Sequence, residues 1–194
     1  MLKVGLTGNI GSGKSTLVKV FESLGVSVYK SDVRAKVLMN NSVKIKIELI
    51  HEFGSKSYQN NELNTSYISG IVFNDPNKLA LLNSIVHPYV LEDFNNWSEK
   101  QNSPYVIKEA AIMFESGSAS LLDKVICVTA SKDLRLKRVV KRDNTTEENI
   151  EKRMLMQWPE KKKVQASDFI IVNNDESLVL PQVLNVHNEL IKLL

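Results

Sequence analysis

The segment with the clearest chemical meaning lies near the amino terminus and is rich in glycine. Its sequence, Gly8-Asn9-Ile10-Gly11-Ser12-Gly13-Lys14-Ser15, fits the pattern of a phosphate-binding loop. Glycines let backbone N–H groups converge on phosphate oxygens, and a helix that begins at the loop adds a favourable dipole. We expect Lys14 to bind the β- and γ-phosphates of a nucleotide and the Ser15 hydroxyl to ligate Mg²⁺. The alternative is a glycine-rich turn that binds no phosphate.

A carboxylate that could serve phosphoryl transfer follows the next apolar run. Residues 26–29 predict a short strand, and Asp32 falls just beyond its carboxyl end, where open parallel sheets bind ligands. At this position Asp32 could accept or orient the proton of an attacking hydroxyl group. The alternative is that Asp32 only caps a helix that runs from Val33 onward.

Four arginines follow in two predicted helices. Arg135, Arg138 and Arg142 are spaced by three and four residues, so they share one helical face and could clamp the transferring phosphates. Arg153, in the following helix, could approach the nucleotide from the other side. The alternative is a solvated basic face, above all for Arg135.

Other candidates carry weaker signals. Glu109, within a predicted strand, and Glu115, just after it, could each hold Mg²⁺ through water or form a structural salt bridge. His87 precedes a proline, and a lone histidine is commonly a packing or capping group. We expect no histidine-bound metal, because His51 and His187 offer no ligand spacing.

The hydrophobic pattern predicts the scaffold that must position these residues. Apolar runs indicate five strands, at residues 2–6, 26–29, 105–110, 124–129 and 169–172. Helical spacing occurs at residues 15–24, 132–142 and 146–158, the last with Thr145 or Thr146 as its cap. Residues 33–101 have mostly helical periodicity, with a polar break at 54–64 and a long segment, 77–97, interrupted at Pro88. Strands separated by helices imply a parallel, three-layer α/β fold.

Composition and charge narrow the class of protein. The chain has 194 residues, of which 43% are hydrophobic, enough for one core. Its net charge is +3, yet residues 132–163 hold eleven Lys or Arg against six Asp or Glu, which favours an anionic ligand over a general nucleic-acid surface. The single cysteine, Cys127, excludes an intrachain disulfide and suits the reducing cytosol. We find no signal peptide and no membrane-spanning run, so we expect a protein that is neither exported nor membrane-embedded.

Several separated motifs together resemble the dephospho-CoA kinase family, and the resemblance runs along nearly the whole chain. In order, they are Gly5 to Thr16, Ser31-Asp32, Ile71-Val72-Phe73, Leu82 to Pro88, Ile112-Met113-Phe114-Glu115, Arg138 to Asp143, Arg153-x-x-x-Gln157 and Ser167 to Asn173. The chain departs from the family's usual residues at Asn9 and Asp175, both commonly glycine, and at Lys30, Thr65 and Ala111. A phosphate loop alone would not produce this set of matches.

The resemblance implies an architecture and an activity. It implies a P-loop nucleoside-triphosphate-hydrolase fold in one domain, 1–194, with a helical acceptor-binding insertion at 33–101 and a lid at 132–166. The implied reaction transfers the γ-phosphate of ATP, with Mg²⁺, to the ribose 3′-hydroxyl of dephospho-CoA and gives coenzyme A and ADP. The implied protein is cytoplasmic, acts on small molecules and is a monomer or weak homo-oligomer.

The same resemblance assigns roles to single residues. Catalysis falls to Asp32, Lys14, Arg142 and Arg138. ATP binding falls to Asn9, Ile10, Gly11, Ser12, Gly13, Lys14, Ser15, Thr16 and, near adenine, Asn173. Acceptor binding falls to Thr7, Asp32, His87 and Glu115.

Three other functions stay open on sequence grounds. The first is another small-metabolite or nucleoside monophosphate kinase, with the same loop and lid but a different acceptor pocket. The second is a GTP-dependent switch, although Asn173-Asn174-Asp175 lacks the lysine of the usual guanine-binding motif. The third is an ATP-binding scaffold that has lost catalysis.

Overall fold

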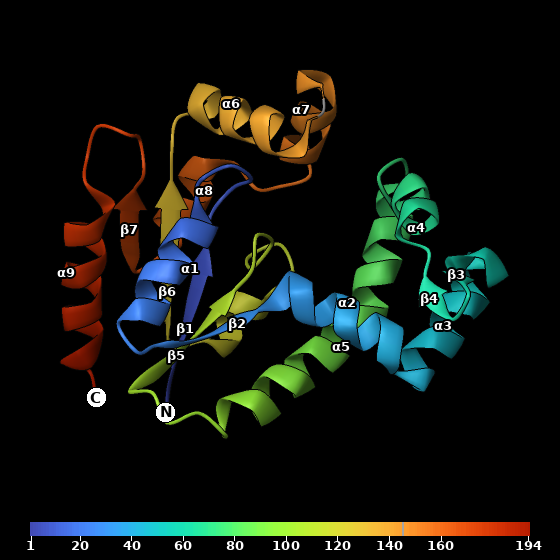
Figure 1. The fold of residues 1–194 in the computed structure, drawn as a ribbon, viewed down its shortest axis with the longest axis horizontal. Coiled ribbons are helices and arrows are strands. Elements are labelled where there is room, and N and C mark those ends of the chain that lie inside the picture. Colours follow the sequence, from blue (N-terminus) through green and yellow to red (C-terminus); the bar gives the residue numbers. More distant parts are fainter. Residues whose placement is uncertain (145) are drawn as a thin grey trace. The chain divides into compact units, whose positions relative to one another are not determined.

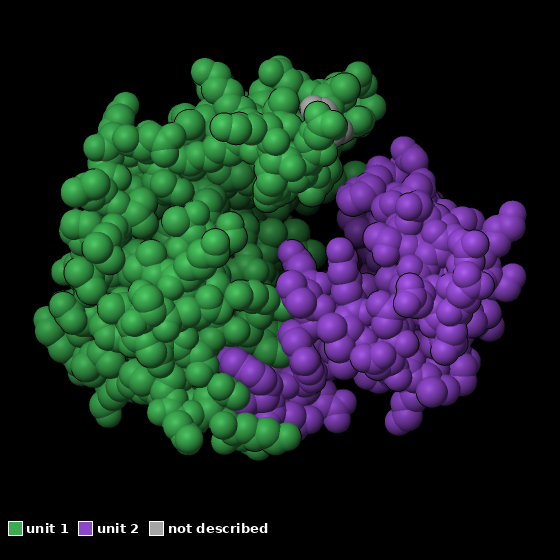
Figure 2. All heavy atoms as spheres, in the orientation of Figure 1, with its two compact units in different colours: residues 1–30, 98–194 green, residues 31–97 purple. Residues whose placement is uncertain are grey.

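A computed structural model of the protein describes residues 1–144 and 146–194, so the predicted cap at Thr145 lies outside the described residues. The chain divides into two compact units (Figure 2). The larger unit contains residues 1–30 and 98–194, and the smaller contains residues 31–97.

The larger unit is built on a five-stranded parallel sheet (Figure 1). The strand order is β2-β5-β1-β6-β7, and the bounds are β1 Leu2–Thr7, β2 Ser27–Lys30, β5 Tyr105–Glu109, β6 Lys124–Thr129 and β7 Phe169–Val172. The five predicted strands are therefore confirmed. In the central register Leu6 pairs with Glu109 on one side and with Ile126 on the other, so the ends of these strands meet at one edge. That edge is where a parallel sheet binds ligands.

Helices cover both faces of the sheet. Their bounds in this unit are α1 Lys14–Ser23, α6 Lys132–Asp143, α7 Glu147–Leu155, α8 Glu160–Gln165 and α9 Val179–Ile191, with a 3₁₀ turn, η2, at Ser118–Leu121. Leu6 of β1, Phe21 of α1 and Leu190 of α9 are fully buried in one core. Successive side chains of a strand point to opposite faces, so Gly5 faces the other side, where a Cβ would lie 2.4 Å from the sulfur of Met113. The arrangement is the predicted three-layer α/β fold.

One helical prediction needs correction in this unit. The helix expected at 146–158 ends at Leu155, and after Pro159 a separate helix, α8, begins. A proline cannot donate to the preceding turn and restrains the residue before it, so the chain breaks here and restarts. Thr146 is the cap of α7, since its hydroxyl accepts a hydrogen bond from the N–H of Asn149 at 3.4 Å.

The smaller unit is mainly helical. Its elements are α2 Ser31–Asn41, α3 Val43–Phe53, η1 Ser55–Ser57, β3 Tyr58–Gln59, β4 Glu62–Leu63, α4 Thr65–Val72 and α5 Pro76–Ser98, the last residue of α5 belonging to the larger unit. The predicted polar break at 54–64 contains a short antiparallel hairpin. Its turn residues, Asn60 and Asn61, have φ of 50° and 70°, values that asparagine tolerates better than most residues.

The predicted interruption at Pro88 is wrong. Helix α5 runs through Pro88 without a break for 23 residues. Pro88 has no N–H for the carbonyl of Ser84, so the helix forgoes one bond there. Val86 and Val90, on either side, are buried, and this packing holds the helix together. Among the described residues, no helix is long and apolar enough to cross a membrane.

Candidate active site

The glycine-rich loop connects the end of β1 at Thr7 to the start of α1 at Lys14. Gly11 and Gly13 take φ of 81° and 94°, a conformation that favours glycine. The loop is also tightly enclosed: a Cβ on Gly8 would lie 2.4 Å from the carbonyl oxygen of Val128, and one on Gly11 would lie 2.5 Å from that of Arg135. Glycine is therefore required here for close packing as well as for backbone shape. The loop leads directly into the amino terminus of α1, a natural anion site.

Lys14 lies folded back over the loop. Its Nζ donates to the carbonyl oxygen of Gly8 at 2.9 Å and lies 3.9 Å from Oε1 of Glu109, with 11% of the side chain exposed. The salt-bridge alternative for Glu109 is thus observed. The position keeps the ammonium of Lys14 beside the loop whose N–H groups would receive phosphates.

The start of α1 also fits Mg²⁺. Ser15 and Thr16 are exposed in the first turn of α1, beside Lys14. The described residues hold no cluster of three or more His, Cys, Asp or Glu that could hold a metal ion. Mg²⁺ bound to nucleotides usually takes one or two protein oxygens and fills its other positions with water and phosphate oxygens. An exposed hydroxyl at this point suits that mode, and the role of Ser15 stays a prediction.

Arg138 connects α6 to the phosphate loop. From α6, its Nη1 lies 3.5 Å from the carbonyl oxygen of Gly11, and its Nη2 lies 3.5 Å from Oδ1 of Asn173 and 2.5 Å from Oδ1 of Asp175. Asn173, just after β7, in turn donates from Nδ2 to the carbonyl oxygen of Ser12 at 2.8 Å. The structure therefore brings together three groups predicted from separate parts of the sequence: the loop, Arg138 and Asn173.

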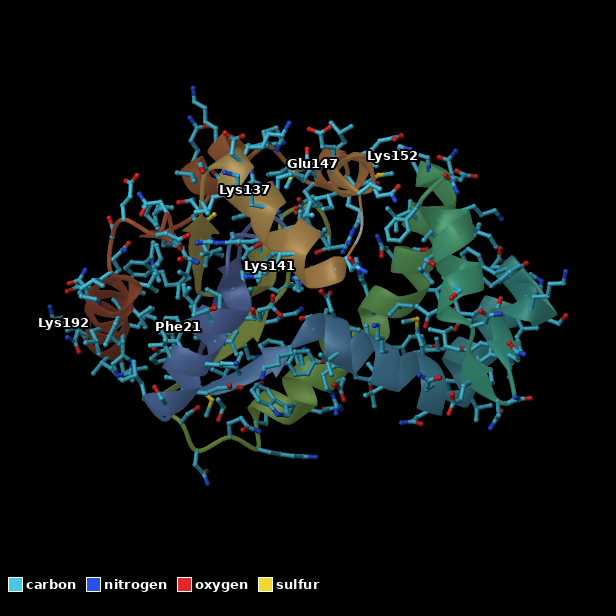
Figure 3. The ribbon with its side chains drawn as sticks, turned by 45° about the horizontal axis from the view of Figure 1, so that its top comes forward. Phe21, Lys137, Lys141, Glu147, Lys152 and Lys192 are labelled. Atoms are coloured by element: carbon cyan, nitrogen blue, oxygen red, sulfur yellow. The ribbon has the colours of Figure 1, made fainter. Side chains whose placement is uncertain are left out.

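Arg142 and Arg153 share one carboxylate. Arg142 donates to Asp143 from Nε at 2.6 Å and from Nη2 at 3.0 Å, and Nη1 of Arg153 donates to the same carboxylate at 2.8 Å. The hydrogen bond from Arg142 is the main reason that the pKa of Asp143 falls to about 2. The other basic residues of these helices include Lys137 and Lys141 along α6 and Lys152 on α7, all exposed (Figure 3).

Arg135 differs from the other arginines. Only 7% of it is exposed, and its Nε donates to the carbonyl oxygen of Ala130 at 3.0 Å and lies 3.5 Å from Oε2 of Glu160. The alternative that Arg135 belongs to a solvated basic face is therefore wrong. Arg135 holds α6 and α8 to the end of β6.

Glu115 belongs to a buried network that the sequence did not predict. Its Oε1 lies 2.8 Å from Nζ of Lys163, which is fully buried, and accepts the backbone N–H of Trp158 at 2.7 Å. Lys163 also donates to the carbonyl oxygen of Ala111 at 2.7 Å, and the buried Thr7 donates from Oγ1 to that oxygen at 3.4 Å. The position of Glu115 just after an apolar segment was the only sequence signal for this network. The pairing itself could not be predicted, because Lys163 lies far along the chain.

Asp32 and His87 belong to the smaller unit. Asp32 is exposed and is the second residue of α2, which begins at Ser31 directly after β2. The alternative that Asp32 caps a helix starting at Val33 is therefore wrong, because the helix already includes Asp32. His87 is half-buried within α5. Their roles toward an acceptor stay predictions.

Comparison with known proteins now decides the family. The model of the family described as dephospho-CoA kinase matches residues 2–178. A dephospho-CoA kinase of Porphyromonas gingivalis is 36% identical over 187 residues, covering 96% of this chain and 93% of the relative. This chain belongs to the dephospho-CoA kinase family.

Solved structures agree with that assignment. A Thermus thermophilus protein superposes with a TM-score of 0.84 at 27% identity, covering 97% of this chain and 96% of the other. A dephospho-CoA kinase of Campylobacter jejuni superposes with a TM-score of 0.68 at 26% identity, covering 98% and 97%. The predicted family, the α/β P-loop kinase fold and an ATP-dependent kinase that phosphorylates a hydroxyl group are confirmed. The alternative of a GTP-dependent switch does not agree with this family.

Two departures from the usual dephospho-CoA kinase residues have structural consequences. Asn9 is 5% exposed and donates from Nδ2 to the carbonyl oxygen of Trp158 at 3.0 Å, a bond that glycine could not make. Asp175 has φ of 63°, so it keeps a backbone shape typical of glycine while its carboxylate binds Arg138. Both departures add contacts, one from the loop to Trp158 and one to Arg138 of α6, without changing Lys14.

Proposed function

We propose that this protein transfers the γ-phosphoryl group of ATP to the ribose 3′-hydroxyl of dephospho-CoA, giving coenzyme A and ADP. The observation that supports this most directly is Lys14, held beside a tightly enclosed phosphate loop with Arg138 over it, in a chain that matches the dephospho-CoA kinase family over residues 2–178. The cytoplasm is the compartment we propose, and a monomer or weak homo-oligomer the assembly.

The transfer is an in-line displacement. The bond between the γ-phosphorus and the β–γ bridging oxygen breaks, a bond between that phosphorus and the ribose 3′-oxygen forms, and the hydroxyl proton leaves. The Ser15 hydroxyl would hold Mg²⁺, which would reduce the negative charge of the phosphates during the transfer. Lys14, Arg138 and Arg142 compensate the charge on the transferring group.

The remaining roles in the proposal concern nucleotide and acceptor. The loop from Asn9 to Thr16 binds the phosphates, and Asn173 lies near adenine. Asp32 orients the ribose hydroxyl and receives its proton, since it follows the carboxyl end of β2, one of the parallel strands. Acceptor binding falls to Thr7, His87 and Glu115 together with the helical segment 33–101, and the lid is the segment 132–166.

Release of ADP from Mg-ATP tests this proposal. Dephospho-CoA is compared with adenosine, AMP, CMP and shikimate as acceptors, and Asp32→Asn is compared with wild type. Asp123→Asn is the matched control: Asp123 is an exposed aspartate that accepts the N–H of Lys3 at 2.7 Å, and asparagine can still accept it. We expect activity with dephospho-CoA alone, reduced about 100-fold or more by Asp32→Asn and unchanged by Asp123→Asn.

Two outcomes would contradict parts of the proposal. Activity with another acceptor but not with dephospho-CoA would reject the substrate while leaving a P-loop kinase. Full activity of Asp32→Asn would reject the role of that carboxylate, since asparagine can orient a hydroxyl but cannot take its proton.

A further inference from the structure

A chain of hydrogen bonds connects the phosphate loop to a buried ion pair. Residues Gln157 and Trp158 lie between the end of α7 and the start of α8. Oε1 of Gln157 accepts the backbone N–H of Ile10 at 2.8 Å, and the carbonyl oxygen of Trp158 accepts Nδ2 of Asn9 at 3.0 Å. Two consecutive residues at the base of the lid segment therefore hold the first half of the loop.

The same two residues are fixed from behind. The backbone N–H of Trp158 donates to Oε1 of Glu115 at 2.7 Å, and that oxygen also receives Nζ of Lys163 at 2.8 Å. The indole of Trp158 stacks on Phe114 with ring centroids 5.8 Å apart and planes 8° apart. The ammonium of Lys162 also lies over the Trp158 ring, 3.3 Å from its centroid. Trp158 is thus held through both its backbone and its side chain.

The burial of Lys163 is the feature of this network that phosphate binding does not explain. It is fully buried, and the charged partner that its contacts show is Glu115, itself only 14% exposed. Burying a charge is unfavourable unless it is paired and hydrogen-bonded, and a buried pair fixes the geometry of the groups around it. The second bond of Lys163, to the carbonyl oxygen of Ala111, ties the pair to the segment that follows β5.

We propose that Lys163 is a positioning residue for phosphoryl transfer. By neutralising Glu115 it keeps the acceptor for the Trp158 N–H in place, and through Gln157 and Trp158 it holds Asn9 and Ile10 in the shape that receives ATP. Lys163 touches neither nucleotide nor acceptor. The kinetic part of this inference rests on the proposed function; the structural part does not.

The test uses Trp158 as an internal probe. The chain has two tryptophans, so Trp97→Phe leaves Trp158 as the only indole, and all variants carry that change. Lys163→Met removes the buried charge at similar length. Lys163→Met with Glu115→Gln removes both charges and keeps an oxygen that can accept the Trp158 N–H. Lys161→Met, an exposed lysine of the same helix, is the matched control.

Three measurements are made at a temperature where circular dichroism shows each variant folded: acrylamide quenching of Trp158, binding of a fluorescent ATP analogue, and kcat and KM for ATP with dephospho-CoA. Displacement of a positioned group by about 1 Å can reduce rates about 100-fold, so we expect Lys163→Met to lower kcat/KM for ATP by about 10- to 100-fold. It should also raise the quenching constant of Trp158 and weaken binding of the analogue. The double variant should recover most of the loss in Trp158 quenching and in analogue binding, two measurements that involve no acceptor, and Lys161→Met should match the parent in all three.

Gln157→Ala keeps the inference testable if Lys163→Met does not fold. It removes the acceptor for the Ile10 N–H and leaves no buried charge unpaired. One hydrogen bond is worth about 1 kcal/mol, so kcat/KM for ATP should fall about three- to tenfold, while stability falls by no more than the contribution of that one bond.

Two results would overturn the inference. One is Lys163→Met lowering only the unfolding temperature, with Trp158 quenching, analogue binding and kcat/KM unchanged in the folded protein. The other is unchanged kinetics of Gln157→Ala. A parent protein that binds the ATP analogue but does not phosphorylate dephospho-CoA would refute the proposed substrate instead, because quenching and analogue binding still report on Lys163.

Discussion

Replacing Gly13 by alanine separates the two reasons for a glycine in the phosphate loop. Gly13 precedes α1 with φ of 94°, and a Cβ there would lie 2.1 Å from Nδ2 of Asn173. Gly117 precedes η2 with φ of 73° and has no atom within 4 Å of its Cβ position among the described residues. Gly117→Ala therefore imposes the backbone penalty alone, whereas Gly13→Ala also imposes the collision.

The magnitudes follow from these contacts. A left-handed conformation costs an alanine about 1–2 kcal/mol, which is the whole effect expected for Gly117→Ala. At Gly13 the Asn173 amide must also either move, losing its 2.8 Å bond to the carbonyl oxygen of Ser12, or stay overpacked. Losing that bond costs about 1 kcal/mol, and overpacking costs about 1–3 kcal/mol. Added to the backbone penalty, either cost means that Gly13→Ala should lower the free energy of unfolding by about 2–5 kcal/mol in total.

Urea unfolding followed by circular dichroism measures these differences, and a double-mutant cycle identifies their cause. In a background of Asn173→Ala, the penalty of Gly13→Ala should fall to that of Gly117→Ala, about 1–2 kcal/mol, because the colliding amide is gone. If Gly13→Ala costs no more than Gly117→Ala, or if its cost is the same with and without Asn173, the reasoning is refuted.

Three further predictions concern other parts of the chain. Pro88→Ala restores a donor for the Ser84 carbonyl within α5, so urea unfolding should show a gain of about 1–3 kcal/mol, and a loss would contradict this account. The pKa of Asp143 is lowered from 3.8 to about 2, chiefly by Arg142, so its stabilising effect is present above pH 3.8 and is lost as pH falls toward 2. The difference in Tm between wild type and Asp143→Asn should accordingly be constant at neutral pH and shrink only in that acid range. Burial raises the pKa of the Cys127 thiol to about 11, so Ellman's reagent at neutral pH should react only after unfolding in guanidinium, with Cys127→Ser as a control.

The strands and the phosphate loop were predictable because their signals are local. Strands buried on both faces are short apolar runs, and the loop is one continuous motif whose glycines are required at fixed positions. Pro88 misled for a physical reason: proline disfavours a helix interior, but the buried residues on each side, Val86 and Val90, outweigh one missing hydrogen bond. The two-residue turn at Asn60 and Asn61 was a usable hairpin signal within a segment otherwise taken as a polar break.

Partners far apart in the sequence account for most of what could not be predicted at the site. Glu109 was placed correctly in its strand, but its pairing with Lys14 depends on the register of β1 against β5. Likewise, nothing near Glu115 indicates that Lys163 will be buried against it. Such contacts are set by the packing of whole elements, so residue type and spacing leave the alternatives open.

The basic surplus of residues 132–163 shows why counting charges identifies a region and not a site. Arg135 and Lys163 contribute to the surplus but are buried against carboxylates, so they hold the fold and are not accessible to a ligand. Arg138 differs because its carboxylate partner, Asp175, has a side chain 65% exposed. An exposed pair of this kind contributes only about 0–1 kcal/mol, and a polyphosphate offers a guanidinium stronger, charge-assisted bonds. In the proposed function, we therefore expect ATP to displace Asp175 from Arg138 at little cost, whereas an anion that displaced Glu115 from Lys163 would leave a buried carboxylate unpaired. The exposure of each cation's partner, more than the number of cations, separates the basic residues available to nucleotide from those that support the site.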